Sequence, residues 1–335
     1  MKFLFTGLFL AFVLSANAFD TNNFVKKYCT ETKDALICRN FIFTAAEKND
    51  IQKTKFTISN APRIELINSD IGSFNENLVN KFPNAVELYL NDCIIYLNYT
   101  VSSISANNVK LQKLSIEQSS LYFNNNSAAL SKLTALKTIE INIPNYLQYS
   151  NIDDVFFSKN TNLETVDIRG YLVDSVSAKA FANLKKLTTL KIIGTSARYF
   201  NDTLMKSNTL LKEVNFDSNS ISNIPLNDFF PKTLEKISFR FNKIQVITNK
   251  TFAGLTKLKV LSLSRNKIGI VSNNAFVLPA LETLQLDSNN IVEIERKTIS
   301  SCVNLKEILV NGNQIAKFPS DFLDDLKNIE NAVLF

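Results

Sequence analysis

Short runs of alternating apolar and polar residues recur along this chain. In residues 258–268, LKVLSLSRNKI, leucine or isoleucine stands at the first, fourth, sixth and eleventh positions and asparagine at the ninth. Such alternation predicts a short strand whose side chains point in turn to the two faces of a sheet. The spacing recurs every 23 to 27 residues. The clear units begin at Leu211, Leu234, Leu258, Leu281 and Leu305. Weaker units begin at Ala61, Ala85, Leu111, Leu136, Leu163 and Leu187, and a half-unit begins at Ile329.

A single unit of this length cannot bury its own apolar face. Units must therefore stack and share one core, with their strands forming a parallel sheet on the inside of a curve. Eleven units and the terminal half-unit predict a solenoid of about twelve strands. A large apolar residue at the nineteenth position of the unit predicts a second buried column towards the convex side: Phe181, Met205, Phe229, Phe252, Phe276 and Ile299.

The recurring pattern L-x-x-L-x-L-x-x-N-x-L resembles the extracellular leucine-rich repeat family, and the resemblance covers nearly all of the chain from Ala61 onward. It implies an α/β leucine-rich repeat solenoid with a helical or irregular convex side. Secreted members and those of the Toll and Slit type act in recognition, adhesion or signalling. The expected organisation is a signal peptide in residues 1–18, an N-terminal cap in residues 19–60 and the solenoid in residues 61–335.

The asparagine at the ninth position has a structural explanation. Where a strand turns away, backbone N–H and C=O groups lose their sheet partners, and an inward amide with two donors and an acceptor can replace them. The column consists of Asn219, Asn242, Asn266, Asn289 and Asn313.

Other residues occupy the ninth position in the N-terminal half. Serine, threonine and cysteine are small and can partly replace the amide, whereas Pro144 and Tyr171 cannot. We therefore expect the solenoid to be least regular around residues 142–172, as a bend or an outward loop, unless the change is tolerated sequence drift. The full column reads Ser69, Cys93, Ser119, Pro144, Tyr171 and Thr195.

The N-terminus predicts export. Lys2 precedes an apolar run from Phe3 to Leu14, and a small-residue segment follows that ends at Ala18. This is the layout of a secretory signal peptide, and the run is shorter than the ~20 residues of a membrane-spanning helix. We expect cleavage after Ala18 and a secreted, extracellular protein without a membrane span. Loss of Lys2 changes the formal charge from +6 to +5, and no basic stripe predicts nucleic-acid binding.

Two of the four cysteines lie close together near the mature N-terminus. Cys29 and Cys38 would form a disulfide in the oxidising secretory route, and this segment resembles the disulfide-bearing cap of extracellular members. Cys93 and Cys302 lie too far apart in the repeat register to pair, so we expect buried thiols.

The C-terminal cysteine-rich cap common in the family is missing. The last strand could be a sufficient cap, the chain could be incomplete, or an exposed end could form a homo-oligomer. Four N-x-S/T sequons predict glycans along one flank of the solenoid: Asn98, Asn125, Asn201 and Asn249.

The composition argues against catalysis. The chain has no histidine, which removes serine and cysteine triads and histidine metal sites, and its glycines form no phosphate-binding loop. The best carboxylate pair, Glu140 with Asp167, would lie on an open sheet rather than in an enclosed pocket. We expect a non-enzymatic protein without a metal or cofactor.

The outward strand residues can vary without touching the core, so they are the expected contact surface. Val260, Ser262, Ser264 and Arg265 are where the unit at Leu258 could touch a ligand, and because they are mostly small and neutral, we expect the contacts nearer the charged middle of the array. Arginine and aromatic residues amid polar neighbours are typical of protein-binding patches. The leading hypothesis is a soluble protein that binds an extracellular protein or a pathogen surface; the alternatives are a self-associating matrix or secretion component and an enzyme inhibitor. The candidate ligand-binding residues are Glu140, Asp167, Arg169, Lys191, Asp217, Arg240 and Phe241.

Overall fold

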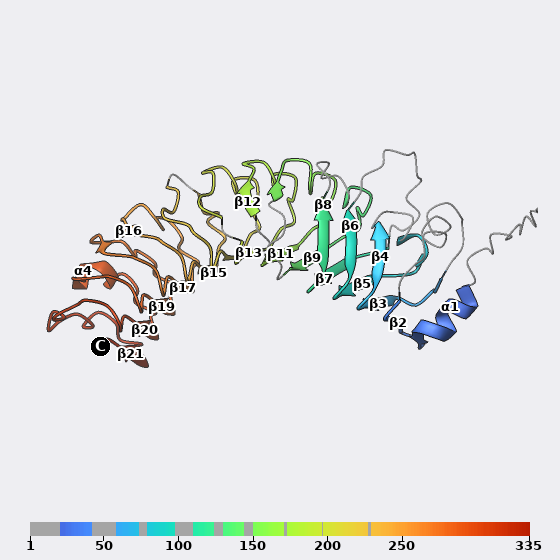
Figure 1. Cartoon of the computed structure of the whole chain (residues 1–335). Helices are drawn as coiled ribbons and strands as arrows, with labels where there is room; N and C mark the ends of the chain where they lie inside the picture. The colour runs from blue at the N-terminus through green and yellow to red at the C-terminus, as the bar shows by residue number, and fades with distance from the viewer. Residues whose placement is uncertain are drawn as a thin grey trace, which may run out of the picture.

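A computed structural model shows the chain as a curved solenoid (Figure 1). It describes residues 21–41, 58–73, 79–97, 110–123, 130–143, 150–170, 173–195, 197–226 and 229–335. The signal peptide predicted in residues 1–18 lies outside these ranges.

One long sheet lines the inner side of the curve. In spatial order its fourteen strands are β1 (Cys29–Glu31), β2 (Ala35–Arg39), β3 (Arg63–Ile67), β5 (Glu87–Asn91), β7 (Lys113–Glu117), β9 (Thr138–Asn142), β11 (Thr165–Arg169), β13 (Thr189–Ile193), β14 (Glu213–Asn215), β15 (Lys236–Ser238), β17 (Val260–Ser262), β19 (Thr283–Gln285), β20 (Glu307–Leu309) and β21 (Asn331–Val333).

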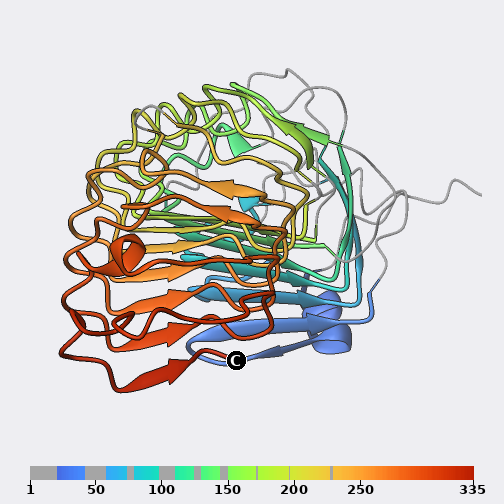
Figure 2. The same ribbon diagram turned by 90° about the vertical axis from the view of Figure 1, so that its left-hand side faces the viewer.

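The sheet confirms the predicted repeat register. Each strand from β2 onward pairs in parallel with the next, and equivalent residues lie opposite one another, as Glu140 does to Asp167 and Asp167 to Lys191. Without the hairpin strands β1 and β2, the fourteen described strands leave twelve, one for each unit and one for the terminal half-unit. Viewed from the C-terminal end, the units lie stacked with their strands side by side (Figure 2).

The outer parts of the units contain more strand and less helix than expected. Three small parallel sheets replace the helical or irregular surface over part of the described chain, and α4 is a single turn. The first sheet contains β4 (Asp70–Ser73), β6 (Ile94–Leu97) and β8 (Ser120–Phe123). The second sheet contains β10 (Ser150–Ile152) and β12 (Val173–Val176), and the third contains β16 (Val246–Ile247) and β18 (Ile270–Val271). The described helices are α1 (Thr21–Tyr28) and α4 (Arg296–Ile299).

The column at the nineteenth position is buried as predicted. Phe181, Phe252 and Phe276 are fully enclosed, and ring centroids along this column lie 5.9 Å apart for Phe157 and Phe181 and 6.2 Å for Phe252 and Phe276. Such offset aromatic contacts add to the stability gained from apolar burial.

The asparagine column forms the predicted amide ladder. Asn266 Nδ2 donates to the carbonyl oxygens of Phe239 in the preceding unit at 2.8 Å and of Leu263 in its own unit at 3.0 Å. Its Oδ1 accepts from the backbone N–H of Ile244 at 3.1 Å. Asn242 repeats these contacts one unit earlier. Each amide therefore satisfies backbone groups of two units at once.

The small residues of the N-terminal half replace part of this network. Ser119 Oγ accepts from the backbone N–H of Cys93 at 3.0 Å, and the Cys93 thiol donates to the carbonyl of Leu66 at 3.2 Å. Burial raises the pKa of the Cys93 thiol to about 11 and that of Cys302 to about 12, so both remain protonated at neutral pH. The prediction of buried thiols is confirmed.

A second set of inward amides was not expected from the sequence. Asn160 and Asn208 are fully buried towards the convex side. Asn208 Nδ2 donates to the carbonyl oxygens of Phe181 and Leu184, both at 2.9 Å, and Asn160 makes the equivalent bonds two units earlier. These residues satisfy carbonyl groups of the outer turns through Nδ2, but unlike the ninth-position amides their buried Oδ1 atoms have no hydrogen-bond partner among the described residues.

The expected irregularity around residues 142–172 is confined to the outer part of the unit within the described chain. β9 and β11 pair without a break in register, whereas β10 and β12 show a register shift next to Ser150. Pro144 and Tyr171 lie outside the described residues. The inner sheet therefore continues through the segment with the weakest repeat signal.

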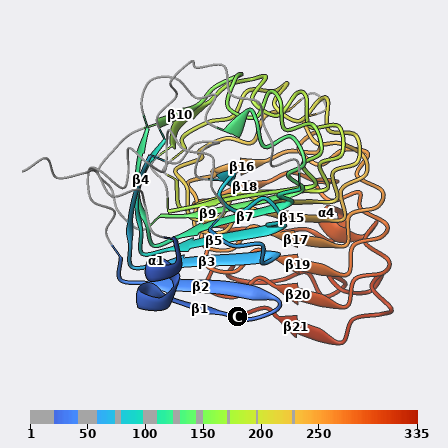
Figure 3. The same ribbon diagram turned by 90° about the vertical axis from the view of Figure 1, so that its right-hand side faces the viewer.

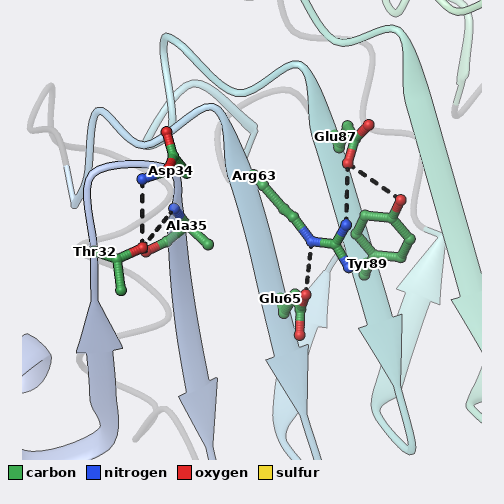
Figure 4. A network of polar contacts seen from close by, with 7 residues as sticks. All are labelled: Thr32, Asp34, Ala35, Arg63, Glu65, Glu87 and Tyr89. Atoms are coloured by element: carbon green, nitrogen blue, oxygen red, sulfur yellow. Dashed lines mark hydrogen bonds and ion pairs between the residues drawn. The ribbon is translucent and has the colours of Figure 1, made fainter.

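The N-terminal end carries a disulfide hairpin. β1 pairs antiparallel with β2, and Cys29 and Cys38 lie opposite each other and are joined in a disulfide, with α1 beside them (Figure 3). Thr32 Oγ1 accepts from the backbone N–H of Ala35 at 3.0 Å in the intervening turn (Figure 4). β2 then pairs with β3, which connects the hairpin to the first unit.

Candidate functional site

The concave face is built from the outward residues at the third, fifth and seventh positions of each unit. The inward residues between them are buried, so the strands hold these outward side chains in parallel rows. Neighbouring side chains in a row lie one strand spacing apart, about 4.8 Å at the backbone. Charged residues can therefore interact along a strand or between adjacent strands.

Arg63 organises the charges at the N-terminal end of this face. Its Nε lies 2.7 Å from Glu65 Oε1 and its Nη1 lies 3.5 Å from Glu87 Oε2, while Tyr89 OH donates to the same Glu87 oxygen (Figure 4). The guanidinium also lies 4.2 Å from the centroid of the Tyr89 ring. All four side chains are thus engaged with one another.

Of the predicted residues, Glu140, Asp167 and Arg169 come together. Arg169 donates from Nε and Nη2 to the two carboxylate oxygens of Asp167, at 2.8 and 2.7 Å. These bonds hold the pKa of the Arg169 guanidinium above its usual value. Glu140 pairs instead with Lys113, at 2.9 Å. A hollow of about 260 Å³ opens here, lined by Glu117, Glu140, Ile141, Asn142, Asp167 and Arg169.

Lys191 and Asp217 lie further along the face and have separate partners. Lys191 Nζ lies 2.9 Å from Glu213 Oε1. Asp217 Oδ1 accepts from Ser238 Oγ at 2.5 Å and from the backbone N–H of Arg240 at 2.7 Å. Asp217 therefore fixes the backbone of the next unit, and no ion pair joins it to the Arg240 guanidinium among the described contacts.

Phe241 holds an unusual backbone conformation at the edge of the concave face. It occupies the eighth position of its unit, where the chain turns so that the ninth residue points inward. Its φ is 55°, and the equivalent residues Ser218, Arg265 and Ser288 have φ between 56° and 58°. Such left-handed conformations are common for glycine and asparagine and rare for bulky residues. The Phe241 ring is nevertheless 46% exposed.

Two arginines lie beside this exposed ring. Arg240 Cζ is 5.7 Å and Arg265 Cζ is 5.1 Å from the Phe241 ring centroid, within the range of cation–π attraction. The buried Nε of Arg240 has no hydrogen-bond partner among the described residues. Arg265 is a possible contact residue of its own unit in the sequence but is not among the candidate ligand-binding residues, although it and Phe241 occupy the eighth positions of adjacent units.

We predict that Phe241→Asn changes the free energy of unfolding by less than about 1 kcal/mol. Asparagine tolerates the left-handed region, and relief of about 1–2 kcal/mol of backbone strain offsets the lost cation–π contacts. The reverse change at the equivalent position, Ser288→Phe, should lower stability by about 1–2 kcal/mol. Urea titration followed by far-UV circular dichroism measures both. A loss of more than 2 kcal/mol in Phe241→Asn, roughly the scale for truncating packed side chains, would identify a packing residue instead.

The structure describes two of the four sequon asparagines. Asn201 and Asn249 are exposed, whereas Asn98 and Asn125 lie outside the described residues. No helix in the described ranges is long and apolar enough to span a membrane.

Comparison with known proteins identifies the repeat. Residues 232–279 match the family model "Leucine rich repeat", and residues 129–240 match "BspA type Leucine rich repeat region (6 copies)". A search of curated proteins finds no match.

Three solved structures illustrate the similarity of the fold. A TLR13–ssRNA13 complex matches with a TM-score of 0.71 and 19% identity over 84% of this chain, which spans 40% of the length of the matched chain. An internalin (InlF) from Listeria monocytogenes str. 4b F2365 matches with a TM-score of 0.55 and 17% identity, over 93% of this chain and 88% of its own. A chain in the octameric complex of latrophilin 3, Unc5D and FLRT2 matches with a TM-score of 0.60 and 18% identity. The match covers 91% of this chain and 82% of the matched chain. The fold is a leucine-rich repeat solenoid.

Proposed function

We propose that this chain is a secreted, non-enzymatic recognition protein whose concave face binds a protein outside the cell, either a host protein or a component of a pathogen surface. The leucine-rich repeat fold supports a protein-binding role, since stacked repeats form an extended concave surface. The observation that carries the proposal is the pre-formed Asp167–Arg169 pair in the hollow beside Glu140.

A side chain that is already fixed loses less conformational entropy on binding. Arg169 is held by two hydrogen bonds, and its side chain is 47% exposed, so it can face a partner without a large ordering cost. Three carboxylates, those of Glu117, Glu140 and Asp167, line the hollow together with this one cation, which favours a protein surface with basic groups over a polyanion. The hollow is open and has no histidine, which supports binding over catalysis.

Secretion and glycosylation are part of the same proposal. They rest on the apolar segment before Ala18, on the Cys29–Cys38 disulfide and on the exposed sequon residues Asn201 and Asn249. Expression with residues 1–18 in secretory cells, followed by glycosidase treatment of the medium, tests both. The protein should appear in the medium and decrease in mass; retention inside the cell contradicts secretion, and an unchanged mass contradicts glycosylation.

Charge reversal on the concave face tests the binding site. A pull-down from the native secretion should first capture one stoichiometric foreign protein. Arg169→Glu combined with Arg240→Glu should then weaken its binding by roughly ten-fold or more, because each reversal places a carboxylate where a cation faced the partner. Titration calorimetry measures the affinity, and circular dichroism checks the fold.

A matched control reverses two exposed lysines outside the candidate surface, Lys257→Glu and Lys327→Glu. It changes the net charge equally, so it should retain the affinity if long-range electrostatics are not the cause. Unchanged affinity in the Arg169 and Arg240 variant rules out this surface.

Self-association through the C-terminal end is the second candidate. β21 is the last strand of the described sheet, and Val333 and Phe335 are 36% and 80% exposed. Exposed apolar groups beside an unpaired strand edge favour association. Sedimentation velocity at high concentration tests this candidate, and a monomer excludes it.

A further inference from the structure

We infer that the solenoid carries a discrete site for an acidic polypeptide segment that presents an apolar side chain between its carboxylates. The site consists of Arg240, Phe241, Lys243, Arg265 and Lys267, which we term the basic edge. It lies at the seventh, eighth and tenth positions of two adjacent units, along the edge of the concave face, to which Arg240 belongs. This inference rests on the proposed binding function and specifies the chemistry of the partner.

The basic edge differs from the rest of the surface in its charge balance. Arg63, Lys113, Arg169 and Lys191 on the concave face each lie in an ion pair. None of the four cations of the basic edge has an ion pair with a described residue. Lys243, Arg265 and Lys267 are exposed, and Arg240 is partly exposed. Their charge is therefore available to compensate carboxylates of a partner.

Phe241 supplies the apolar element of the site. Its exposed ring lies within about 6 Å of both guanidiniums, and its left-handed backbone is costly for a phenylalanine. Glycine, asparagine or serine fills the same position at lower cost in several other units, as Gly194 and Ser218 do. Strain of this kind is associated with functional sites. Arginine and aromatic side chains together are the residues that most often dominate protein interfaces.

The site is confined to two units, which sets the size of the ligand. The preceding unit has Asp217, Ser218 and Ser220 at the seventh, eighth and tenth positions, and the following unit has Asp287, Ser288 and Asn290. Two strand spacings cover only about 10 Å. A bound single strand of nucleic acid would need a longer basic track and would meet Asp217 or Asp287 at either end. A short segment with two or three carboxylates fits between these acids.

The binding geometry follows from the side chains. Each guanidinium can donate two parallel hydrogen bonds to one carboxylate, which is the strongest polar contact available here. Because the Nε of Arg240 is buried, a carboxylate of the ligand would approach the terminal Nη groups of this partly exposed side chain. An apolar ligand side chain would cover the ring of Phe241 and exclude water from both contacts.

Selection from a displayed library of short random peptides tests the inference. Against the unmodified protein, enriched peptides should carry several Asp or Glu residues next to an apolar or aromatic residue. The tightest peptide, labelled and titrated at about 150 mM salt, should bind roughly ten-fold more weakly to Arg240→Glu combined with Arg265→Glu. Phe241→Asn should reduce its affinity several-fold, while Lys257→Glu combined with Lys327→Glu should retain it.

Several results would overturn the site: no acidic enrichment, equal binding to the double variant, or a short oligothymidylate that binds more tightly than the selected peptide. Arg169→Glu alone separates this inference from the proposed function. If that variant loses the native partner while no acidic peptide is enriched, concave-face recognition stands and the basic edge fails. If the peptide binds but no foreign protein is captured, the proposed function fails and the basic edge stands.

Discussion

Replacing Asn289 with alanine should lower the free energy of unfolding by roughly 3 kcal/mol. Its Nδ2 donates to the carbonyl oxygens of Leu263 at 3.0 Å and Leu286 at 2.9 Å, and its Oδ1 accepts from the backbone N–H of Ile268 at 3.1 Å. Asn289 is buried, so water cannot reach these groups once the amide is removed. Urea titration followed by far-UV circular dichroism measures the change.

Asn290→Ala is the matched control for this prediction. Asn290 is the same residue type at the next position, but its side chain is exposed and forms no hydrogen bond with a described residue. Its replacement should change stability by less than about 0.5 kcal/mol. If the two variants were equally stable, the amide ladder would contribute nothing beyond the stacking of the leucines.

The inner sheet could be predicted because its pattern repeats. A residue such as Leu261 must be apolar in every unit, since it stacks on equivalent residues above and below, and this constraint is visible in the sequence. The asparagine column is equally regular, because one amide has to satisfy two units. Because these features repeat, the strand register, the inward faces and the phenylalanine column can be predicted from the sequence alone.

The outer sheets and the left-handed backbone conformation at the eighth position could not be predicted from the sequence. Asn68, Gly170, Phe241 and Arg265 share this backbone conformation but no side-chain property. The conformation is imposed by the turn that follows most strands of the inner sheet, so the type of side chain does not reveal it. The amides of the outer turns, such as Asn208, recur too irregularly to form a pattern.

The candidate site was predicted as a set of outward residues but not as a set of contacts. Arg169 pairs with Asp167 on its own strand rather than with Glu140 on the preceding strand β9, because side chains two residues apart lie on the same face and within reach. The unpaired state of Arg240 likewise depends on Asp217 binding the backbone instead of the guanidinium. Such choices depend on rotamers, which residue spacing does not specify.

Gly170→Ala should destabilise the solenoid by roughly 3–4 kcal/mol, because it combines two penalties. Gly170 has a φ of +61°, and a Cβ there would lie 2.6 Å from the carbonyl oxygen of Ile143 in the preceding unit. Ile143, at the eighth position of its own unit, does not adopt the left-handed conformation of its counterparts. The close approach therefore belongs to the unit with the weakest repeat signal.

Gly194→Ala separates the two penalties. Gly194 occupies the eighth position of the next unit with a φ of +68°, but the nearest atom to its Cβ would be 3.7 Å away. Gly194→Ala should therefore lower the free energy of unfolding only by the cost of the left-handed backbone, about 1–2 kcal/mol. The difference in the free energy of unfolding between the two variants measures the overlap with Ile143. Denaturant titrations of both variants test this. Equal losses would show that the backbone of this unit moves aside, in which case the junction between the units at Leu136 and Leu163 is compliant rather than tightly packed.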